Sequence, residues 1–209
     1  MTAQQALSYL QREIHTVIAA TTDEEGRPVT CAIDIMDADA GGVYFLTARG
    51  KGFCRRLRRT GYLALTGVKG EDTLSCVAVS VRGRVRELGG GPLPRLLEQN
   101  PYMHQIYPTA RSQQALTVFC LYQGTGEWFD LSRQPVGRFS FSFGGARMAE
   151  EGYRITGACT GCRACAAVCP QNCIDFTRTP AVIRQANCLH CGACQAACPH
   201  GAVREEGLA

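Results

Sequence analysis

The sequence contains no run of 18 apolar residues, and its first fifteen residues, MTAQQALSYLQREIH, have neither the basic region nor the apolar core of a signal peptide. We therefore expect no membrane-spanning helix, no secretory signal and a cytoplasmic location. No G-x-G-x-x-G follows an expected strand, which disfavours a Rossmann nucleotide site. The net charge is only +4 over 209 residues. One basic cluster, RGKGFCRRLRR, does not indicate a nucleic-acid-binding protein, so we expect neither nucleic acid nor membrane as a partner.

Cysteine is abundant by contrast, with thirteen residues in the chain. The number is odd, and eight of the thirteen fall into two matched clusters near the C-terminus. This pattern argues against the disulfide framework of a secreted protein. It favours ligation of a cofactor in a reducing compartment.

The two clusters form an internal repeat with an offset of 29 residues. Each has the spacing C-x2-C-x2-C-x3-C-P, the bacterial ferredoxin run, in which the fourth cysteine ligates the other cluster. The spacing therefore predicts two [4Fe–4S] clusters with crossed ligands. The first set is Cys159, Cys162, Cys165 and Cys198, and the second is Cys188, Cys191, Cys194 and Cys169.

Residues 152–206 thus resemble a two-cluster bacterial-type ferredoxin domain. Zinc is the rival interpretation, but zinc sites use two CxxC pairs with a longer gap between them. The ninth cysteine, Cys173, has Ala202 as its repeat partner, so we expect a buried free thiol. His190 and His200 occupy variable positions, where we expect surface residues or neighbours of the ligands.

The first 140 residues predict many short strands with two small helices between them. Helices are expected over 7–14, 51–61 and 92–101, and strands over 15–22, 29–40, 43–48, 62–68, 74–88 and 115–133. This order describes a meander that closes on itself rather than a doubly wound sheet. In the C-terminal part, 153–156 and 201–204 are expected as short outer strands and 181–188 as the middle hairpin arm.

The strings TTDEEGRPVTCAI, GGVYFLTARGKGFCRRLRR and EWFDLS resemble the pyridoxamine 5′-phosphate oxidase-like family, the FMN-binding split barrels. The resemblance covers about residues 10–132. It implies a mainly β split barrel with short helices, a homodimer, and one FMN per subunit at the dimer interface. Related split barrels also bind deazaflavin F420 or haem, so these two cofactors stay open as alternatives.

The string TARGKGF offers the phosphate of FMN a helix start and two cations. We expect Lys51 to contact the phosphate first and Arg49 second, with Arg55 in reserve, although some relatives carry a basic pair where this chain has Gly52 and Phe53. The resemblance places the flavin ring against 28–33 and 47–48. The residues expected there are Thr30, Cys31, Ala32 and Thr47.

These features predict an FMN domain over 1–143, a linker over 144–152 and a small α+β ferredoxin domain with two [4Fe–4S] clusters over 153–209. A flavin exchanges one or two electrons, whereas an iron–sulfur cluster moves one. We therefore expect a redox protein in which single electrons pass between the clusters and FMN. It is either an FMN-dependent oxidoreductase that reduces a small molecule or an electron carrier linking a ferredoxin-like donor to a partner protein. A redox sensor is the third interpretation, and the catalytic residues remain unassigned.

Overall fold

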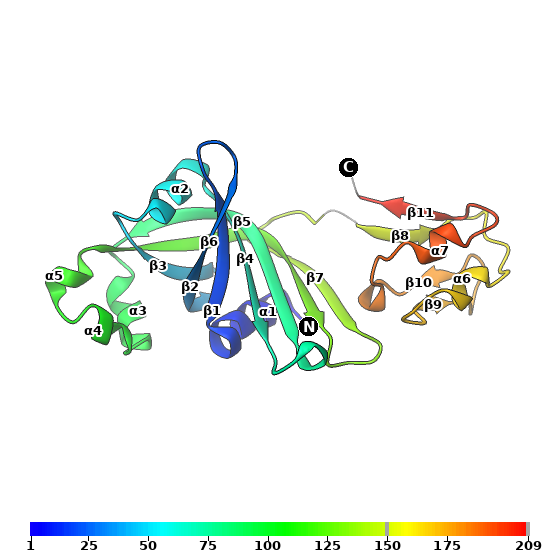
Figure 1. The fold of residues 1–209 in the computed structure, drawn as a ribbon, viewed down its shortest axis with the longest axis horizontal. Coiled ribbons are helices and arrows are strands. Elements are labelled where there is room, and N and C mark those ends of the chain that lie inside the picture. The colour runs from blue at the N-terminus through cyan, green and yellow to red at the C-terminus, as the bar shows by residue number, and fades with distance from the viewer. Residues whose placement is uncertain (149–150, 208–209) are drawn as a thin grey trace.

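The structure is a computed structural model that describes residues 1–148 and 151–207. A β-barrel lies on one side of the molecule, and a small unit built around the cysteines lies on the other (Figure 1). The predicted linker, 144–152, includes residues 149–150, and the predicted second domain includes 208–209. These four residues lie outside the described part of the chain.

Seven antiparallel strands form one sheet in the order β3-β2-β1-β4-β5-β6-β7, and β3 also pairs with β6. The extra pairing closes six strands into a barrel. The long strand β6 makes the split, because its first half pairs with β3 and its second half with β7. The strands are β1 (Thr16–Thr22), β2 (Pro28–Asp39), β3 (Gly42–Ala48), β4 (Tyr62–Lys69), β5 (Val77–Gly89), β6 (Leu116–Asp130) and β7 (Gly137–Phe143).

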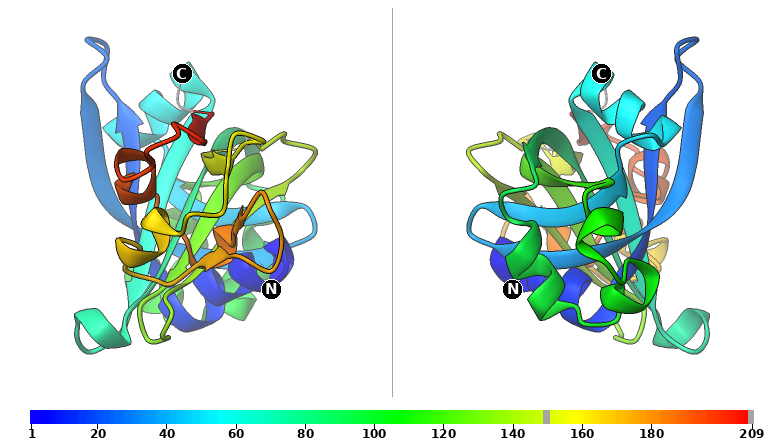
Figure 2. Two further views of the ribbon diagram at one scale, coloured as in Figure 1. Left: turned by 90° about the vertical axis from the view of Figure 1, so that its right-hand side faces the viewer. Right: turned by 90° about the vertical axis from the view of Figure 1, so that its left-hand side faces the viewer.

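Short helices cover the barrel. They are α1 (Ala3–Tyr9), the π-helix η1 (Leu10–Ile14), α2 (Gly52–Thr60), the 3-10 helix η2 (Thr73–Ser75), α3 (Leu93–Gln99), α4 (Met103–Ile106) and α5 (Ala110–Gln113). The last three gather on the side opposite the cysteine unit (Figure 2). The expected helices near 7–14, 51–61 and 92–101 are therefore present, whereas α4, α5 and β7 were not expected from the sequence.

Alternating side chains of the strands fill the barrel, with Phe45 and Phe119 stacked at 5.9 Å between ring centroids. A second apolar cluster lies outside the barrel under α3. Met36 of β2 belongs to this cluster, because successive strand residues face opposite sides and Ile35 points into the barrel. A β-bulge lies between Ile35 and Asp37. Trp128 is 8% exposed and packs edge-on against Tyr9, which gives this tryptophan a core position.

The described residues of the cysteine unit form four short strands in two antiparallel pairs, together with three helical turns. Its elements are β8 (Gly152–Ile155), α6 (Ala164–Ala167), β9 (Ile174–Asp175), β10 (Val182–Ile183), the 3-10 helix η3 (Gln185–Asn187), α7 (Ala193–Ala196) and β11 (Val203–Glu206). β8 pairs with β11, and β9 with β10. The strand expected over 201–204 begins two residues later than predicted, and the core of the unit consists largely of cysteine and aliphatic side chains.

Candidate functional site

The cysteines surround two separate cavities in the small unit. We call the first the outer cavity; its cysteines are Cys159, Cys162, Cys165 and Cys198. We call the second the inner cavity; its cysteines are Cys169, Cys173, Cys188, Cys191 and Cys194. The fourth cysteine of each run therefore lies with the first three of the other run, as the crossed pattern predicts, and the ligand assignment itself stays a prediction. In residues 1–148 and 151–207, no three potential ligands converge on the point that a single ion would occupy.

The fourth cysteine of each run sits among backbone amides. The Cys198 thiol has a lowered pKa, mainly because the Ala202 N–H donates to its sulfur at 3.3 Å. Burial opposes ionisation of Cys169, yet the N–H groups of residues 171–173 outweigh it, and the pKa of Cys169 is lowered as well. Since a thiolate is the form that binds metal, both positions are prepared for ligation.

Cys173 differs from Cys169, although their sulfur atoms are only 3.5 Å apart. Burial and the neighbouring Cys169 raise the pKa of Cys173 to about 12, which keeps it a thiol. In the outer cavity, Ala202 holds the equivalent position. The inner cavity therefore carries one sulfur more than the outer cavity, and burial disfavours the thiolate form of that sulfur.

The inner cavity lies against the barrel. Arg138 of β7 reaches the carbonyl oxygen of Cys188 at 3.5 Å, and Asn187 of η3 donates to the carbonyl oxygen of Val136 at 3.1 Å. The side-chain oxygen of Gln171 accepts from the Val136 N–H at 2.8 Å. These bonds fix the inner cavity at the edge of the sheet.

A cluster of cations surrounds the start of α2. Lys51 is its N-cap in extended conformation, and no side chain caps the first N–H groups of the helix. A Cβ built at Gly52 would lie 3.0 Å from Nη1 of Arg56 and 3.7 Å from Nη2 of Arg55. Two guanidinium groups thus converge over the glycine that opens the helix, beside Lys51. This arrangement suits a phosphate.

The structure places two of the three residues expected to bind the phosphate at the start of α2 and the third elsewhere. Lys51 and Arg55 lie at the helix start, and Arg55 also donates to the Gly50 carbonyl at 3.2 Å. Arg49 turns away, because its Nε donates to the Leu116 carbonyl at 3.2 Å. Sequence reasoning missed Arg56, which donates to Thr21 Oγ1 at 2.8 Å. Its position four residues after Gly52, one helical turn on, was the available signal.

The expected ring residues lie on both sides of the barrel wall. Thr30 and Ala32 are exposed on the outer face of β2, while Cys31 points toward the core. Burial raises the pKa of the Cys31 thiol, and the positive charges of Arg56 and Lys51 act in the opposite sense. The hydroxyl of Thr47 is buried without a hydrogen-bond partner in the described residues. A buried hydroxyl without a partner is a group that a bound polar ligand could satisfy.

One polar cluster was not expected from the sequence. His15, at φ 64°, follows the π-helix, and its Nε2 lies 3.0 Å from the Tyr102 hydroxyl. That hydroxyl donates to Asp34 at 2.8 Å. Asp34 is on the outer face of β2, two residues after Ala32. The three residues are far apart in the sequence and meet only through tertiary packing.

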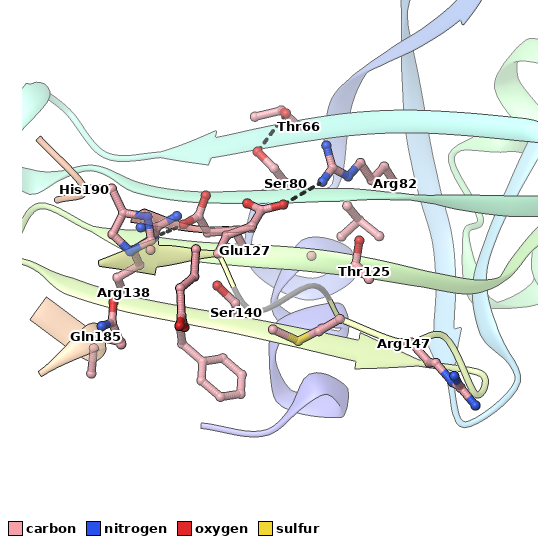
Figure 3. A pocket seen from close by; sticks show the side chains of 18 of the residues that line it. Thr66, Ser80, Arg82, Thr125, Glu127, Arg138, Ser140, Arg147, Gln185 and His190 are labelled. Carbon is pink, nitrogen blue, oxygen red and sulfur yellow. Dashed lines mark hydrogen bonds and ion pairs between the residues drawn. The ribbon is translucent and has the colours of Figure 1, made fainter. Parts of the chain in front are cut away.

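A cavity of about 850 Å³ lies between the outer face of β4–β7 and the cysteine unit (Figure 3). Thr66 and Ser80 share a hydrogen bond of 2.9 Å on its wall. Its charged groups include the Arg138–Glu127 ion pair and the looser pair of Arg82 with Glu151, at 3.8 Å. His190 is in the same wall, where burial lowers its pKa. The cavity therefore has hydroxyl and charged groups on its wall, and Tyr153 lines both it and the inner cavity.

The chain is similar to known proteins in both halves. Residues 3–127 match the family described as pyridoxamine 5′-phosphate oxidase, and residues 158–202 match the 4Fe-4S dicluster domain. No curated protein matches the chain.

Solved structures share the barrel. A NimC/NimA family protein from Clostridium acetobutylicum has a TM-score of 0.56 at 16% identity, covering 66% of this chain and 90% of that one. A protein related to general stress protein 26, from the same organism, has a TM-score of 0.52 at 16% identity, covering 66% of this chain and 95% of that one. A heme binding protein from Mycobacterium smegmatis has a TM-score of 0.53 at 15% identity, covering 68% of this chain and 58% of that one.

The fold and the two cavities define a split-barrel protein joined to an iron–sulfur unit. The chain belongs to the pyridoxamine 5′-phosphate oxidase family and carries a C-terminal 4Fe-4S dicluster domain. The combination indicates a redox role. No helix in the described part of the chain has the length and apolar character needed to cross a bilayer.

Proposed function

We propose that the chain binds FMN at the start of α2 and two [4Fe–4S] clusters in its cysteine cavities, and that single electrons pass between them to reduce a small molecule. The observation that carries this proposal is the pair of cysteine cavities, whose members follow the crossed repeat, on a unit hydrogen-bonded to the barrel. FMN supplies exchange of either one or two electrons, which lets one-electron centres serve a two-electron reaction.

The chain's own residues toward FMN are Lys51, Arg55 and Arg56 for the phosphate, together with the first N–H groups of α2. The helix dipole and three cations favour a dianion at this point. The exposed face of Thr30 and Ala32 is the surface offered to the remainder of the cofactor. Haem is the alternative occupant, because a similar structure is a heme binding protein.

The cavity of about 850 Å³ favours an enzyme over a carrier that lacks a substrate. Its size is that of a ligand pocket, and it offers hydroxyl and guanidinium groups. By strand register, the outer-face row runs from Thr30 of β2 through Ala20 and Ala64 to Arg82 of β5. One continuous face therefore joins the proposed flavin strand to the cavity. An electron carrier or a redox sensor is the second candidate, favoured by the exposure of Cys162 and Cys191.

We also propose a homodimer. Apolar side chains stand exposed on the outer face of β1 and β4, with Ile18 at 53% and Val68 at 57%. These residues adjoin the face that carries Thr30 and Ala32. A second copy covering this face would bury the exposed side chains and enclose the cofactor.

Cofactor analysis of anaerobically purified protein tests the proposal. We expect about eight irons per chain, the content of two four-iron clusters, and one FMN. The visible spectrum should lose both the flavin and the iron–sulfur absorbance on reduction. Zinc in place of iron would refute the cluster assignment, and a haem or F420 spectrum without FMN would refute the flavin assignment.

A further inference from the structure

The two cysteine cavities differ in what surrounds them. The inner cavity adjoins the barrel through the bonds of Arg138, Asn187 and Gln171. Within residues 1–148 and 151–207, no hydrogen bond or ion pair joins a side chain that lines the outer cavity to the barrel. α6 of the outer cavity lies toward the end of the unit away from the barrel (Figure 1). Cys162 is exposed there.

Charge is also divided within the small unit. Its acids Glu151, Glu205 and Glu206 belong to the β8–β11 end, where Glu151 faces Arg82 and Glu206 pairs with Arg154 at 2.7 Å. The stretch from 156 to 184 has three arginines and one aspartate. Of these, Arg163 lines the outer cavity, and Arg178 follows Phe176, which also lines it; against the single carboxylate of Asp175, this surface carries a small positive excess.

Arg163, directly after Cys162, has an unusual backbone. It adopts φ 64°, whereas its repeat partner in the other run is Gly192, at φ 74°. The left-handed conformation is strained for a residue with a side chain, so glycine would fit position 163 with less strain than arginine. The guanidinium of Arg163 lies over the Phe176 ring at 5.4 Å, and a Cβ at Gly161 would be 3.5 Å from Thr179.

We define the outer patch as Cys162, Arg163, Phe176, Arg178 and Thr179. All but Phe176 are exposed, and the patch carries two positive charges, with the carboxylate of Asp175 as the neighbouring negative charge. The stacking of Arg163 on Phe176 holds one charge beside the exposed cysteine. We propose that the outer patch is the docking surface for an acidic one-electron carrier protein, a proposal that rests on the proposed function.

The step at this surface is the transfer of one electron from the carrier protein to this chain. One electron leaves the reduced carrier, which is oxidised, and the iron–sulfur group of the outer cavity is reduced by that electron. No bond forms or breaks, and no proton moves. Because electron transfer between proteins weakens steeply with separation, a surface that brings the carrier against Cys162 sets the rate, and complementary charge guides the approach.

The test is anaerobic binding of a fluorescently labelled bacterial-type ferredoxin with a carboxylate-rich surface. Arg163→Gly removes the charge and relaxes the backbone, as Gly192 shows, so the variant should fold. We expect its Kd to rise roughly three- to tenfold at low salt. Arg163→Lys should keep most of the affinity, and salt should weaken binding to the wild type.

Arg12→Gln is the matched control, because Arg12 is exposed on η1 of the barrel. Equal affinity of wild type and Arg163→Gly, an equal loss in Arg12→Gln, or no binding of the ferredoxin would each overturn the proposal. Iron is measured on every sample. If the wild type holds no iron, the proposed function is refuted. If it holds iron but the Kd for the ferredoxin does not change in Arg163→Gly, only the proposed docking surface is refuted.

Discussion

Removal of the Lys51 ammonium should weaken FMN binding while leaving riboflavin binding unchanged. Lys51 caps α2 in extended conformation and has no side-chain hydrogen bond to the helix, so its loss should spare the fold. A hydrogen bond to a charged group contributes about 1.5–3 kcal/mol. Lys51 is exposed, which screens the charge and favours the lower end of that range.

About 1.4 kcal/mol corresponds to tenfold, so we expect Lys51→Ala to raise the Kd for FMN by roughly ten- to thirtyfold. Arg56 remains beside the phosphate and limits the loss. The assay titrates each apo-protein with FMN and with riboflavin, following flavin fluorescence, and Arg27→Ala in the exposed β1–β2 turn is the control.

Two outcomes would refute this reasoning. Unchanged FMN affinity in Lys51→Ala would show that the cation cluster at α2 is not the phosphate site. An equal loss of riboflavin would show that Lys51 supports the fold rather than the phosphate.

Three further predictions follow from the structure. Cys169→Ala should lose about half of the bound iron, whereas Cys173→Ala should keep all of it. The reverse result would show that Cys173 is the ligand and Cys169 the free thiol. Glu87, hydrogen-bonded by Arg58, has a pKa lowered to about 2, so its stabilisation is complete above about pH 4.5 and is lost as the pH falls toward 2. Glu87→Gln should therefore cost about 1 kcal/mol at neutral pH, because solvent screens this exposed ion pair, and progressively less in acid, measured by denaturant unfolding; a cost independent of pH would contradict this. Ile18→Asp should turn a dimer into a monomer in light scattering, and a wild-type monomer that holds its cofactor would exclude the dimer.

Local patterns of the sequence predicted most of the barrel. Alternation and turn residues located β1 to β6, and the cationic string located α2, which ends at Gly61 with φ 60°. The strand β7 was missed although its sequence, GRFSFSF, alternates with period two. Only Phe141 of this edge strand is buried, so its alternation is a weak sign of a strand that faces the core.

The candidate site could be predicted only where the spacing of residues along the sequence determines which side chains lie together. The repeat of 29 residues gave the membership of both cavities, because the ligands of a cluster follow a fixed local pattern. The meeting of His15 with Asp34 and Tyr102 was not predictable, because it depends on tertiary packing between segments up to 87 residues apart. The turn of Arg49 toward Leu116 has the same cause.

The central claim is that electrons pass between the cysteine-bound clusters and the flavin. Anaerobic stopped-flow spectroscopy tests it directly, with the reduced acidic ferredoxin as donor and the flavin absorbance as readout. We predict that the flavin is reduced in the wild type after the iron–sulfur absorbance begins to fall. In Cys165→Ala, which disrupts the outer cluster, flavin reduction should be at least tenfold slower. Equal rates of flavin reduction in the two proteins would contradict the account.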